Sequence, residues 1–258
     1  MTQERCMGRV EGKVALVTGG GSGLGAADSE ALAREGASVV VTDVKLETAL
    51  AVADRIGNGA VAMALDVSDE AQWIAVMQEI DARFGRLDVL VNNAGVVLSA
   101  DVEDTTLEQY RWVNAIMSDG VFLGCKHAIP LMNKRDGGSI INMSSTGALL
   151  GYPIFFAYSA AKGAVRAMTK SVAVMCQEKG YKIRCNSVHP GSIETPMVQT
   201  AEGRIGQAKE IPDGVLPPGT PGHPKDVAAL VLFLASDESR FINGAELVVD
   251  NAVTIRPF

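Results

Sequence analysis

Short apolar runs alternate along this chain with longer stretches whose apolar residues recur at helical spacing. The apolar runs lie at Val14–Thr18, Ser38–Thr42, Val61–Leu65, Val89–Asn92, Ser139–Met143, Ile183–His189 and Glu246–Val249. Helical spacing occurs between most of them, as in Ala26–Glu35, Leu46–Ile56 and Glu70–Phe84. Runs such as VALVT and SIINM are apolar throughout, which is typical of strands that are buried on both faces.

This alternation of strand and helix predicts an α/β fold. We expect a doubly wound parallel sheet of the Rossmann type, with right-handed crossovers and helices on both faces. The 258 residues fall within the range of one large α/β domain, so we predict a single domain over residues 1–258.

One stretch of the chain lacks the apolar periodicity of either a strand or a helix. Residues 195–224 are rich in glycine, proline and polar residues and carry PPGTPGHP near their end. A long stretch of weak periodicity inside a compact domain is usually a mobile functional loop. We therefore predict a substrate loop or lid here, with a plain surface insertion as the alternative.

Composition and charge narrow the classes of partner. Hydrophobic residues make up 47% of the chain and charged residues 21%, as in ordinary globular proteins. The net charge of −7 argues against nucleic acid or an anionic membrane surface as a partner. Because no apolar run reaches 18 residues, we expect no membrane-spanning segment.

The four cysteines, Cys6, Cys125, Cys176 and Cys185, are far apart and include no CxxC pair. No histidine lies near them at ligand spacing, so we predict buried free thiols and no metal site. The N-terminal MTQERCMGRVEGK lacks the apolar stretch of a signal peptide, so a cytoplasmic location is expected.

A glycine-rich turn, TGGGSGLG, follows the first predicted strand and opens the first predicted helix. Glycine lets the backbone approach a pyrophosphate, and the helix start offers free N–H groups and the positive end of its dipole. Glycine-rich turns are common, but this position between a strand and a helix favours dinucleotide binding. The turn predicts cofactor contacts at Gly19, Ser22, Gly23, Leu24 and Gly25.

Asp43 closes the second predicted strand, 18 residues after Gly25. A carboxylate at this place accepts hydrogen bonds from both ribose hydroxyls and repels the additional phosphate of NADP. Neither Ala26 nor Val44 is a basic residue that would offset this repulsion. We therefore predict NAD as the cofactor, with a solvated strand-end carboxylate as the alternative for Asp43.

Asp28 does not fit this pattern. It lies in the first predicted helix, at a position expected to face the sheet. An unpaired buried carboxylate costs several kcal/mol. We expect Asp28 either to reach water or to have a partner.

A candidate catalytic group follows the strand that ends at Met143. Ser144 and Ser145 come directly after it, and Tyr158 and Lys162 follow four residues apart, on one face of a helix. A lysine ammonium, together with the positive ring of an oxidised nicotinamide, favours the phenolate and lowers the tyrosine pKa. The serine hydroxyl would hold the substrate oxygen beside the phenol, which predicts proton transfer next to hydride transfer. A buried tyrosine and a surface lysine are the alternatives, which the glycine-rich turn disfavours.

Several motifs together resemble the short-chain dehydrogenase/reductase family, from Gly12 to Asp250. They are TGGGSGLG, Asp66-Val67, Asn92-Asn93-Ala94-Gly95, Asn114, Ser145, Tyr158-Ser-Ala-Ala-Lys162 and Pro190-Gly191. The serine-to-tyrosine interval of the family implies that Ser145 supplies the catalytic hydroxyl, with Ser144 as the alternative. The resemblance also implies that Asn114 anchors a water that links Lys162 to bulk solvent.

The resemblance implies cofactor contacts as well. They are Asp66 and Val67 at the adenine, Asn92 and Ala94 along the adenosine ribose, and Gly95, Pro190, Gly191, Ile193 and Thr195 towards the nicotinamide. Tyr158 and Lys162 are also expected at the cofactor, with Lys162 on the nicotinamide ribose. The NNAG motif is compatible with a sheet-stabilising role at the same time.

The C-terminal part of the sequence resembles bacterial NAD-dependent dehydrogenases of cyclic alcohols, such as cyclopentanol, and of 3β/17β-hydroxysteroids. An apolar substrate wall is predicted from Val96, Val97, Leu150, Tyr152 and Phe155. Such a wall suits a hydrophobic secondary alcohol (cyclic, aryl or steroid-like) or its ketone. Core packing and subunit contact are alternatives for these residues.

Two other functions are alternatives to NAD-dependent alcohol oxidation. NADPH-dependent reduction of a 3-oxoacyl-carrier protein is disfavoured by Asp43. A non-catalytic dinucleotide-sensing or scaffold protein on the same fold would tolerate loss of the catalytic residues, which this chain retains. The family resemblance further implies a homotetramer built on the long helices and the C-terminal strand.

Overall fold

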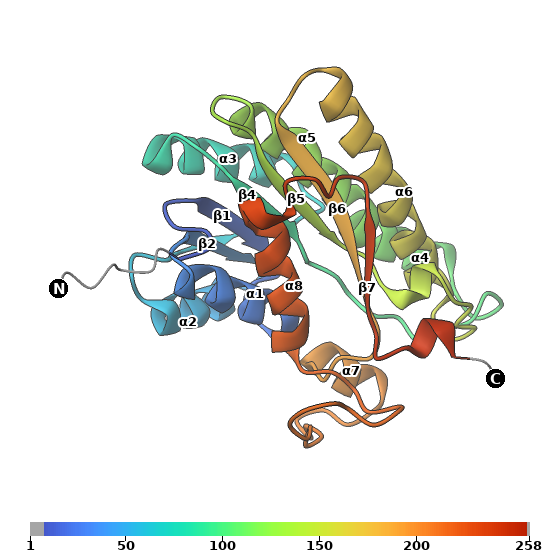
Figure 1. Cartoon of the computed structure of the whole chain (residues 1–258). Coiled ribbons are helices and arrows are strands. Elements are labelled where there is room, and N and C mark those ends of the chain that lie inside the picture. Colours follow the sequence, from blue (N-terminus) through green and yellow to red (C-terminus); the bar gives the residue numbers. More distant parts are fainter. Residues whose placement is uncertain (1–7, 257–258) are drawn as a thin grey trace.

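A computed structural model describes residues 8–256 of the chain, which form one domain around a seven-stranded parallel sheet (Figure 1). The strands are β1 (Val14–Thr18), β2 (Ser38–Asp43), β3 (Val61–Ala64), β4 (Val89–Asn92), β5 (Gly138–Met143), β6 (Ile183–Pro190) and β7 (Glu246–Val249). Their order in the sheet is β3-β2-β1-β4-β5-β6-β7. The chain winds from β1 to one edge, returns to β4 and continues to the other edge, which confirms the predicted doubly wound fold.

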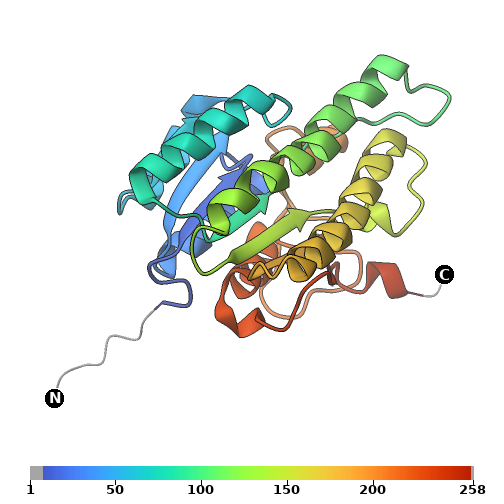
Figure 2. The same ribbon diagram turned by 90° about the horizontal axis from the view of Figure 1, so that it is seen from above.

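Helices cover both faces of this sheet (Figures 1 and 2). They are α1 (Gly23–Arg34), α2 (Leu46–Ile56), α3 (Glu70–Phe84), α4 (Leu107–Asn114), α5 (Gly120–Met132), α6 (Phe156–Glu178), α7 (Pro196–Ala201) and α8 (Pro224–Ala235). One core layer lies beneath α1, α2 and α8, and the other lies beneath α3, α5 and α6. Alternate residues of each strand enter opposite layers: Leu16 packs on the α3 side and Val17 on the α1 side.

The strand order predicts at which edge of the sheet a ligand would bind. β1 lies between β2 and β4, so the crossovers on its two sides run to opposite faces. In doubly wound sheets a crevice opens at this switch point, beyond the carboxyl ends of the strands. The segments that follow β1, β4, β5 and β6 therefore meet at one edge.

The segment between β6 and α8 begins with the short helix α7 and then has no further helix or strand. Its two ends are joined, because the Glu194 N–H donates to the Gly222 carbonyl at 2.9 Å and the Gly222 N–H donates to the Ser192 carbonyl at 2.9 Å. The Arg204 guanidinium lies 3.1 Å from the Glu194 carboxylate and 2.7 Å from that of Glu202. The segment is thus irregular, as predicted, but internally tied; its action as a lid stays a prediction.

Asp28 is where the sequence-based expectation was wrong. Its side chain is fully buried in α1, and neither carboxylate oxygen has a hydrogen-bond partner among residues 8–256. Burial alone raises the pKa of this carboxyl well above its usual value. α1 packs against β1, β2 and the neighbouring α8, which together close its inward side to water.

Of the predicted buried thiols, Cys125, Cys176 and Cys185 are free and buried, and Cys6 lies outside the described residues. No group of side chains able to hold a metal ion occurs within residues 8–256. Over the same residues, no helix combines the length and the apolarity that a membrane crossing requires. The homotetramer stays a prediction.

Candidate active site

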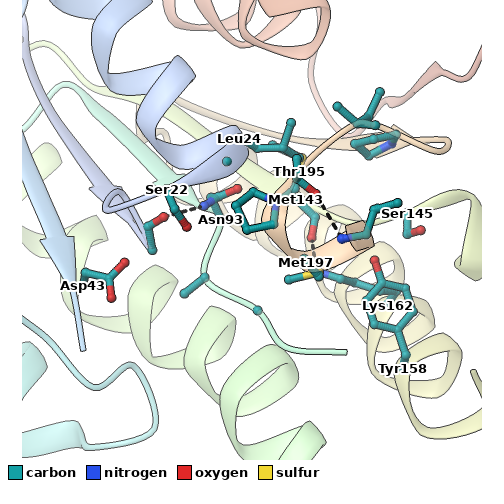
Figure 3. A pocket seen from close by; sticks show the side chains of 18 of the residues that line it. Ser22, Leu24, Asp43, Asn93, Met143, Ser145, Tyr158, Lys162, Thr195 and Met197 are labelled. Atoms are coloured by element: carbon teal, nitrogen blue, oxygen red, sulfur yellow. Dashed lines mark hydrogen bonds between the residues drawn. The ribbon is translucent and has the colours of Figure 1, made fainter. Parts of the chain in front are cut away.

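A pocket of about 380 Å³ opens at the carboxyl edge of the sheet (Figure 3). Asp43 lies at one end of it, and Ser145, Tyr158 and Lys162 lie together at the other. The pocket brings together these residues that were predicted from the sequence: Gly19, Ser22, Gly23, Leu24, Asp43, Ala94, Gly95, Ser145, Tyr158, Lys162, Pro190, Gly191, Ile193 and Thr195.

The glycine-rich turn forms the floor of the pocket. Gly19 has a φ of +61°, and a Cβ there would lie 2.8 Å from the Cα of Ala94, so both conformation and space require glycine. Gly25 lies beneath the turn, where a Cβ would come within 2.3 Å of the Gly19 carbonyl oxygen. Substitution at either position would push the turn into the space that it encloses.

The N-terminus of α1 faces this pocket without a side-chain cap. Ser22 is the N-cap residue, and its hydroxyl makes no capping hydrogen bond, in contrast to Asp69 at α3 and Thr106 at α4. The first N–H groups of α1 therefore remain available to a ligand, and the helix dipole favours an anionic one. Together with the glycine turn, this arrangement fits the pyrophosphate of a dinucleotide.

Asn93 holds the turn in place. Its side-chain N–H donates to the carbonyl oxygens of Thr18 at 2.9 Å and Gly19 at 3.2 Å. The Thr18 hydroxyl in turn accepts from the backbone N–H groups of Asn93 at 3.0 Å and Ala94 at 3.1 Å. These four bonds lock the end of β1 to the end of β4, which is the sheet-stabilising role that the sequence allowed for the NNAG motif.

Asn92, which was predicted to line the pocket, does not. Its buried side chain donates instead to the Asn142 side chain at 2.9 Å, inside the core between β4 and β5. Strand alternation explains this, because Asn92 has the same parity as Leu90, which packs in the α3 side of the core. Asp66 and Val67 also lie outside the pocket lining; the Asp66 carboxylate accepts from the N–H of Ser68 at 2.9 Å.

Asp43 is fixed at the far end of the pocket. Its two oxygens accept from the N–H groups of Gly21 and Lys45, each at 3.1 Å. Each carboxylate oxygen retains further lone pairs, so this geometry leaves Asp43 able to accept from a ribose hydroxyl. Lys45 and Thr48 also line this end, and sequence reasoning had missed both.

The two adjacent serines have different surroundings. Ser144 is buried, and its hydroxyl donates to the Lys162 carbonyl at 3.0 Å, so it ties the end of β5 to α6. The Ser145 hydroxyl accepts from the Gly147 N–H at 3.0 Å, which leaves its hydrogen free to donate towards Tyr158. The geometry therefore favours Ser145 over Ser144 as the reactive hydroxyl.

Tyr158 and Lys162 lie one turn apart on α6, as the spacing predicted. The Lys162 ammonium lies 5.6 Å from the centre of the Tyr158 ring and donates to the Met143 carbonyl at 2.7 Å. Burial raises the pKa of Tyr158, and the hydrogen bond from Ser145 opposes that rise. Burial lowers the pKa of Lys162 to about 8. The expected lowering of the phenol pKa is thus not present in the protein alone, because burial outweighs the hydrogen bond from Ser145.

Asn114 ends α4 immediately before a π-helical turn over Ala115–Asp119, which runs on into α5. Its side-chain N–H donates to the Tyr110 carbonyl at 2.8 Å. Turns of this kind occur frequently at functional sites. The side-chain oxygen of Asn114 is left to accept, and its link to Lys162 through water stays a prediction.

The five residues of the predicted substrate wall are not among those that line the pocket described above. Phe155 stacks edge-on against Tyr158 with ring centres 6.4 Å apart, and Tyr152 stacks in the same way against Phe155. Val96 packs in the small apolar cluster that includes Tyr158. Val97 and Leu150 are half-buried near the same strand ends. Contact of these residues with a substrate stays a prediction; Met143, Met197 and Val198 line the pocket and had been missed.

Comparisons with known proteins agree with this geometry. Residues 19–254 match a family model described as enoyl-(acyl carrier protein) reductase. The chain is 44% identical to an NADP-dependent (R)-specific alcohol dehydrogenase of Lentilactobacillus kefiri, over 95% of this chain and 98% of that protein. It is 43% identical to a 3-beta-hydroxysteroid dehydrogenase of Comamonas testosteroni, over 95% and 97%. It is also 43% identical to a cyclopentanol dehydrogenase of Comamonas sp. (strain NCIMB 9872), over 96% and 99%.

A solved structure shares the whole fold. The short-chain type dehydrogenase/reductase from Mycobacterium marinum superposes with a TM-score of 0.87 at 30% identity, over 96% of this chain and 97% of that one. Fold, pocket and relatives lead to the same assignment. The chain belongs to the short-chain dehydrogenase/reductase family of oxidoreductases, whose members use a nicotinamide dinucleotide.

Proposed function

We propose that this protein interconverts a hydrophobic secondary alcohol and its ketone, with NAD(H) as the preferred cofactor. The observation that supports this most is the placement of Ser145, Tyr158 and Lys162 at one end of a pocket whose other end holds Asp43. The relatives that act on a cyclic alcohol or a hydroxysteroid support a substrate of this class.

The chain's own residues supply the proton chemistry. When bound, the nicotinamide supplies the hydride acceptor for oxidation and the hydride donor for reduction. Ser145 donates a hydrogen bond to the substrate oxygen, and Tyr158 takes the alcohol proton or returns it to the ketone. Lys162 holds positive charge beside the phenol, which favours the phenolate that oxidation requires.

The cofactor preference follows from charge at the adenosine end. The Asp43 carboxylate lines the end of the pocket opposite Tyr158, where the adenosine ribose would bind, and it would repel a phosphate there. Lys45 offsets part of that repulsion, since it lines the same end. The alcohol dehydrogenase of L. kefiri, which is 44% identical, is NADP-dependent, so the proposed preference for NAD depends on the local charge at Asp43.

A panel of secondary alcohols, assayed by NADH absorbance with NAD and with NADP, tests the proposed function. We expect turnover of cyclic, aryl or steroid alcohols, with kcat/KM at least about tenfold higher for NAD because like charges at the ribose oppose NADP. Linear primary alcohols serve as the matched comparison. Turnover of none of the secondary alcohols would refute the substrate class, and a preference for NADP would refute the cofactor assignment.

Replacing Asp43 with alanine and Val44 with arginine is expected to reverse the cofactor preference. The change removes a negative charge and adds an exposed guanidinium beside it, so the ratio of kcat/KM for NADP over NAD should rise about 100-fold or more. Steady-state kinetics with both cofactors measure the ratio. Glu47→Ala, which removes an exposed charge outside the pocket, is the control and should leave the ratio unchanged. An unchanged ratio in the double variant would mean that Asp43 does not contact the ribose.

A further inference from the structure

His189 is a buried histidine that the proposed chemistry leaves unused. It lies in β6, directly before Pro190 and Gly191, and has no exposed surface. Its Nδ1 lies 3.1 Å from the backbone carbonyl oxygen of Ser145, and its Nε2 lies 2.9 Å from the hydroxyl of Ser187. Both ring nitrogens therefore have partners, and one of these partners is the backbone of the serine proposed to hold the substrate.

The partners fix which nitrogen of His189 carries the proton. A carbonyl oxygen only accepts, so Nδ1 is the donor to Ser145. In the neutral ring Nε2 is then the acceptor, and the single hydrogen of the Ser187 hydroxyl is shared between Nε2 at 2.9 Å and the Ala245 carbonyl at 3.4 Å. Burial lowers the pKa of His189, and the charged groups that face it are Glu246 on β7 and Arg166 and Lys162 on α6. The imidazole is thus a neutral, singly oriented donor aimed at the Ser145 carbonyl.

The His189 imidazole donates a hydrogen bond just beyond the point where backbone pairing between β5 and β6 ends. The last backbone bond between the β5 and β6 segments runs from the Ser144 N–H to the Val188 carbonyl at 2.8 Å. Pro190, the next β6 residue in line to donate into this ladder, has no N–H, so β6 supplies no further backbone donor to the segment that begins at Ser144. The His189 side chain supplies one instead, and the Ala148 N–H supplies a second at 3.0 Å. The Ser145 carbonyl is thus held by His189 from the sheet and by Ala148 from the turn that follows Ser145.

We propose that His189 is a positioning residue, which sets the Ser145 hydroxyl at the distance from Tyr158 that the reaction needs. This inference rests on the proposed function of Ser145. The Ser145 hydroxyl is fixed by the Gly147 N–H at 3.0 Å, and the same turn carries the carbonyl that His189 holds. Without the His189 donor the Ala148 N–H alone holds this carbonyl, so the turn and its hydroxyl gain freedom to move. The hydrogen bond from Ser145 lowers the pKa of Tyr158, so its weakening raises that pKa.

Three substitutions separate the two contacts of His189. An asparagine amide N–H replaces Nδ1 and keeps donation to the Ser145 carbonyl, whereas a glutamine amide reaches the position of Nε2 and keeps only the contact with Ser187. Leucine removes both contacts and keeps the volume. His189→Asn is therefore the matched control for His189→Gln and His189→Leu.

We expect His189→Asn to stay near the wild-type kcat/KM for alcohol oxidation, and His189→Gln and His189→Leu to lose about tenfold. The loss stays moderate because the Ala148 N–H still holds the Ser145 carbonyl. In the Gln and Leu variants the pH at which oxidation reaches half its plateau should move up by about one unit, which corresponds to one weakened hydrogen bond. The dissociation constant for NADH should not change in any of them.

Two results would overturn the inference. Wild-type kinetics and an unmoved pH profile in His189→Gln and His189→Leu would mean that the imidazole does not position Ser145. Equal losses in all three variants, with NADH affinity and melting temperature falling in parallel, would mean that His189 only supports the fold. If the wild type turns over no alcohol, the proposed function fails. The inference is then decided by ultraviolet titration of the Tyr158 phenol, read as the difference from Tyr158→Phe, which should shift in the Gln variant and not in the Asn variant.

Discussion

Replacing Tyr158 with phenylalanine is expected to lower kcat for alcohol oxidation about 10³-fold or more, while the dissociation constant for NADH changes less than about twofold. A positioned acid/base contributes about 10²- to 10⁴-fold to a proton-transfer step, and no other phenol lines the pocket within residues 8–256. The phenylalanine ring keeps the edge-on contact with Phe155, so the fold and the cofactor surface remain. Single-turnover kinetics and a fluorescence titration with NADH measure the two quantities.

The control for Tyr158→Phe removes a tyrosine hydroxyl that lies far from the pocket. Tyr181 lies just before β6, at the opposite edge of the sheet, and its hydroxyl is remote from the pocket. Tyr181→Phe should keep wild-type turnover. If Tyr158→Phe keeps more than about a tenth of the wild-type kcat, another group carries the proton and the mechanism proposed above is wrong.

The fold could be predicted from the sequence because the apolar strands and the alternation of strand and helix indicate the same architecture. Strands that are apolar on both faces are buried only when helices cover both sides of the sheet. The alternation of strand and helix then requires right-handed crossover connections between parallel strands. The predicted bounds of Val14–Thr18, Leu46–Ile56 and Glu70–Phe84 are those of β1, α2 and α3. The first helix begins three residues earlier than predicted, at Gly23, because the glycine-rich turn itself supplies its first residues.

Side-chain direction was harder to predict than position in the chain. Asn92 and Asn93 are adjacent, yet one enters the core and the other holds the glycine-rich turn. The alternation of Leu90 and Asn92 would have assigned them correctly if it had been carried to the last residue of the strand. No such signal existed for His189, since its partner is a carbonyl 44 residues away, and such a contact exists only once the fold has formed.

Asp28 shows a further limit of sequence reasoning and leads to a large expected effect on stability. A buried carboxyl without a partner is easier to keep protonated than ionised, so its folded-state pKa is raised, whereas the unfolded chain ionises near pH 4. The folded state therefore holds a proton that the unfolded state has lost. The contribution of Asp28 to the free energy of unfolding is therefore greatest below pH 4. It falls by about 1.4 kcal/mol per pH unit as the pH rises towards the folded-state pKa.

Replacing Asp28 with asparagine is expected to stabilise the protein at pH 8 and to change its stability little at pH 4.5, because the amide has the shape of the carboxylic acid and does not ionise; the gain should grow by about 1.4 kcal/mol per pH unit up to the folded-state pKa of Asp28. Urea unfolding at fixed protein concentration, repeated at several pH values, measures the difference. Glu30→Gln in the same helix removes an exposed carboxylate paired with Arg55 and should change stability by less than about 1 kcal/mol at any pH. If the Asp28 variant is no more stable at pH 8 than at pH 4.5 relative to wild type, the carboxyl is ionised in the folded protein, and water or a partner must reach it.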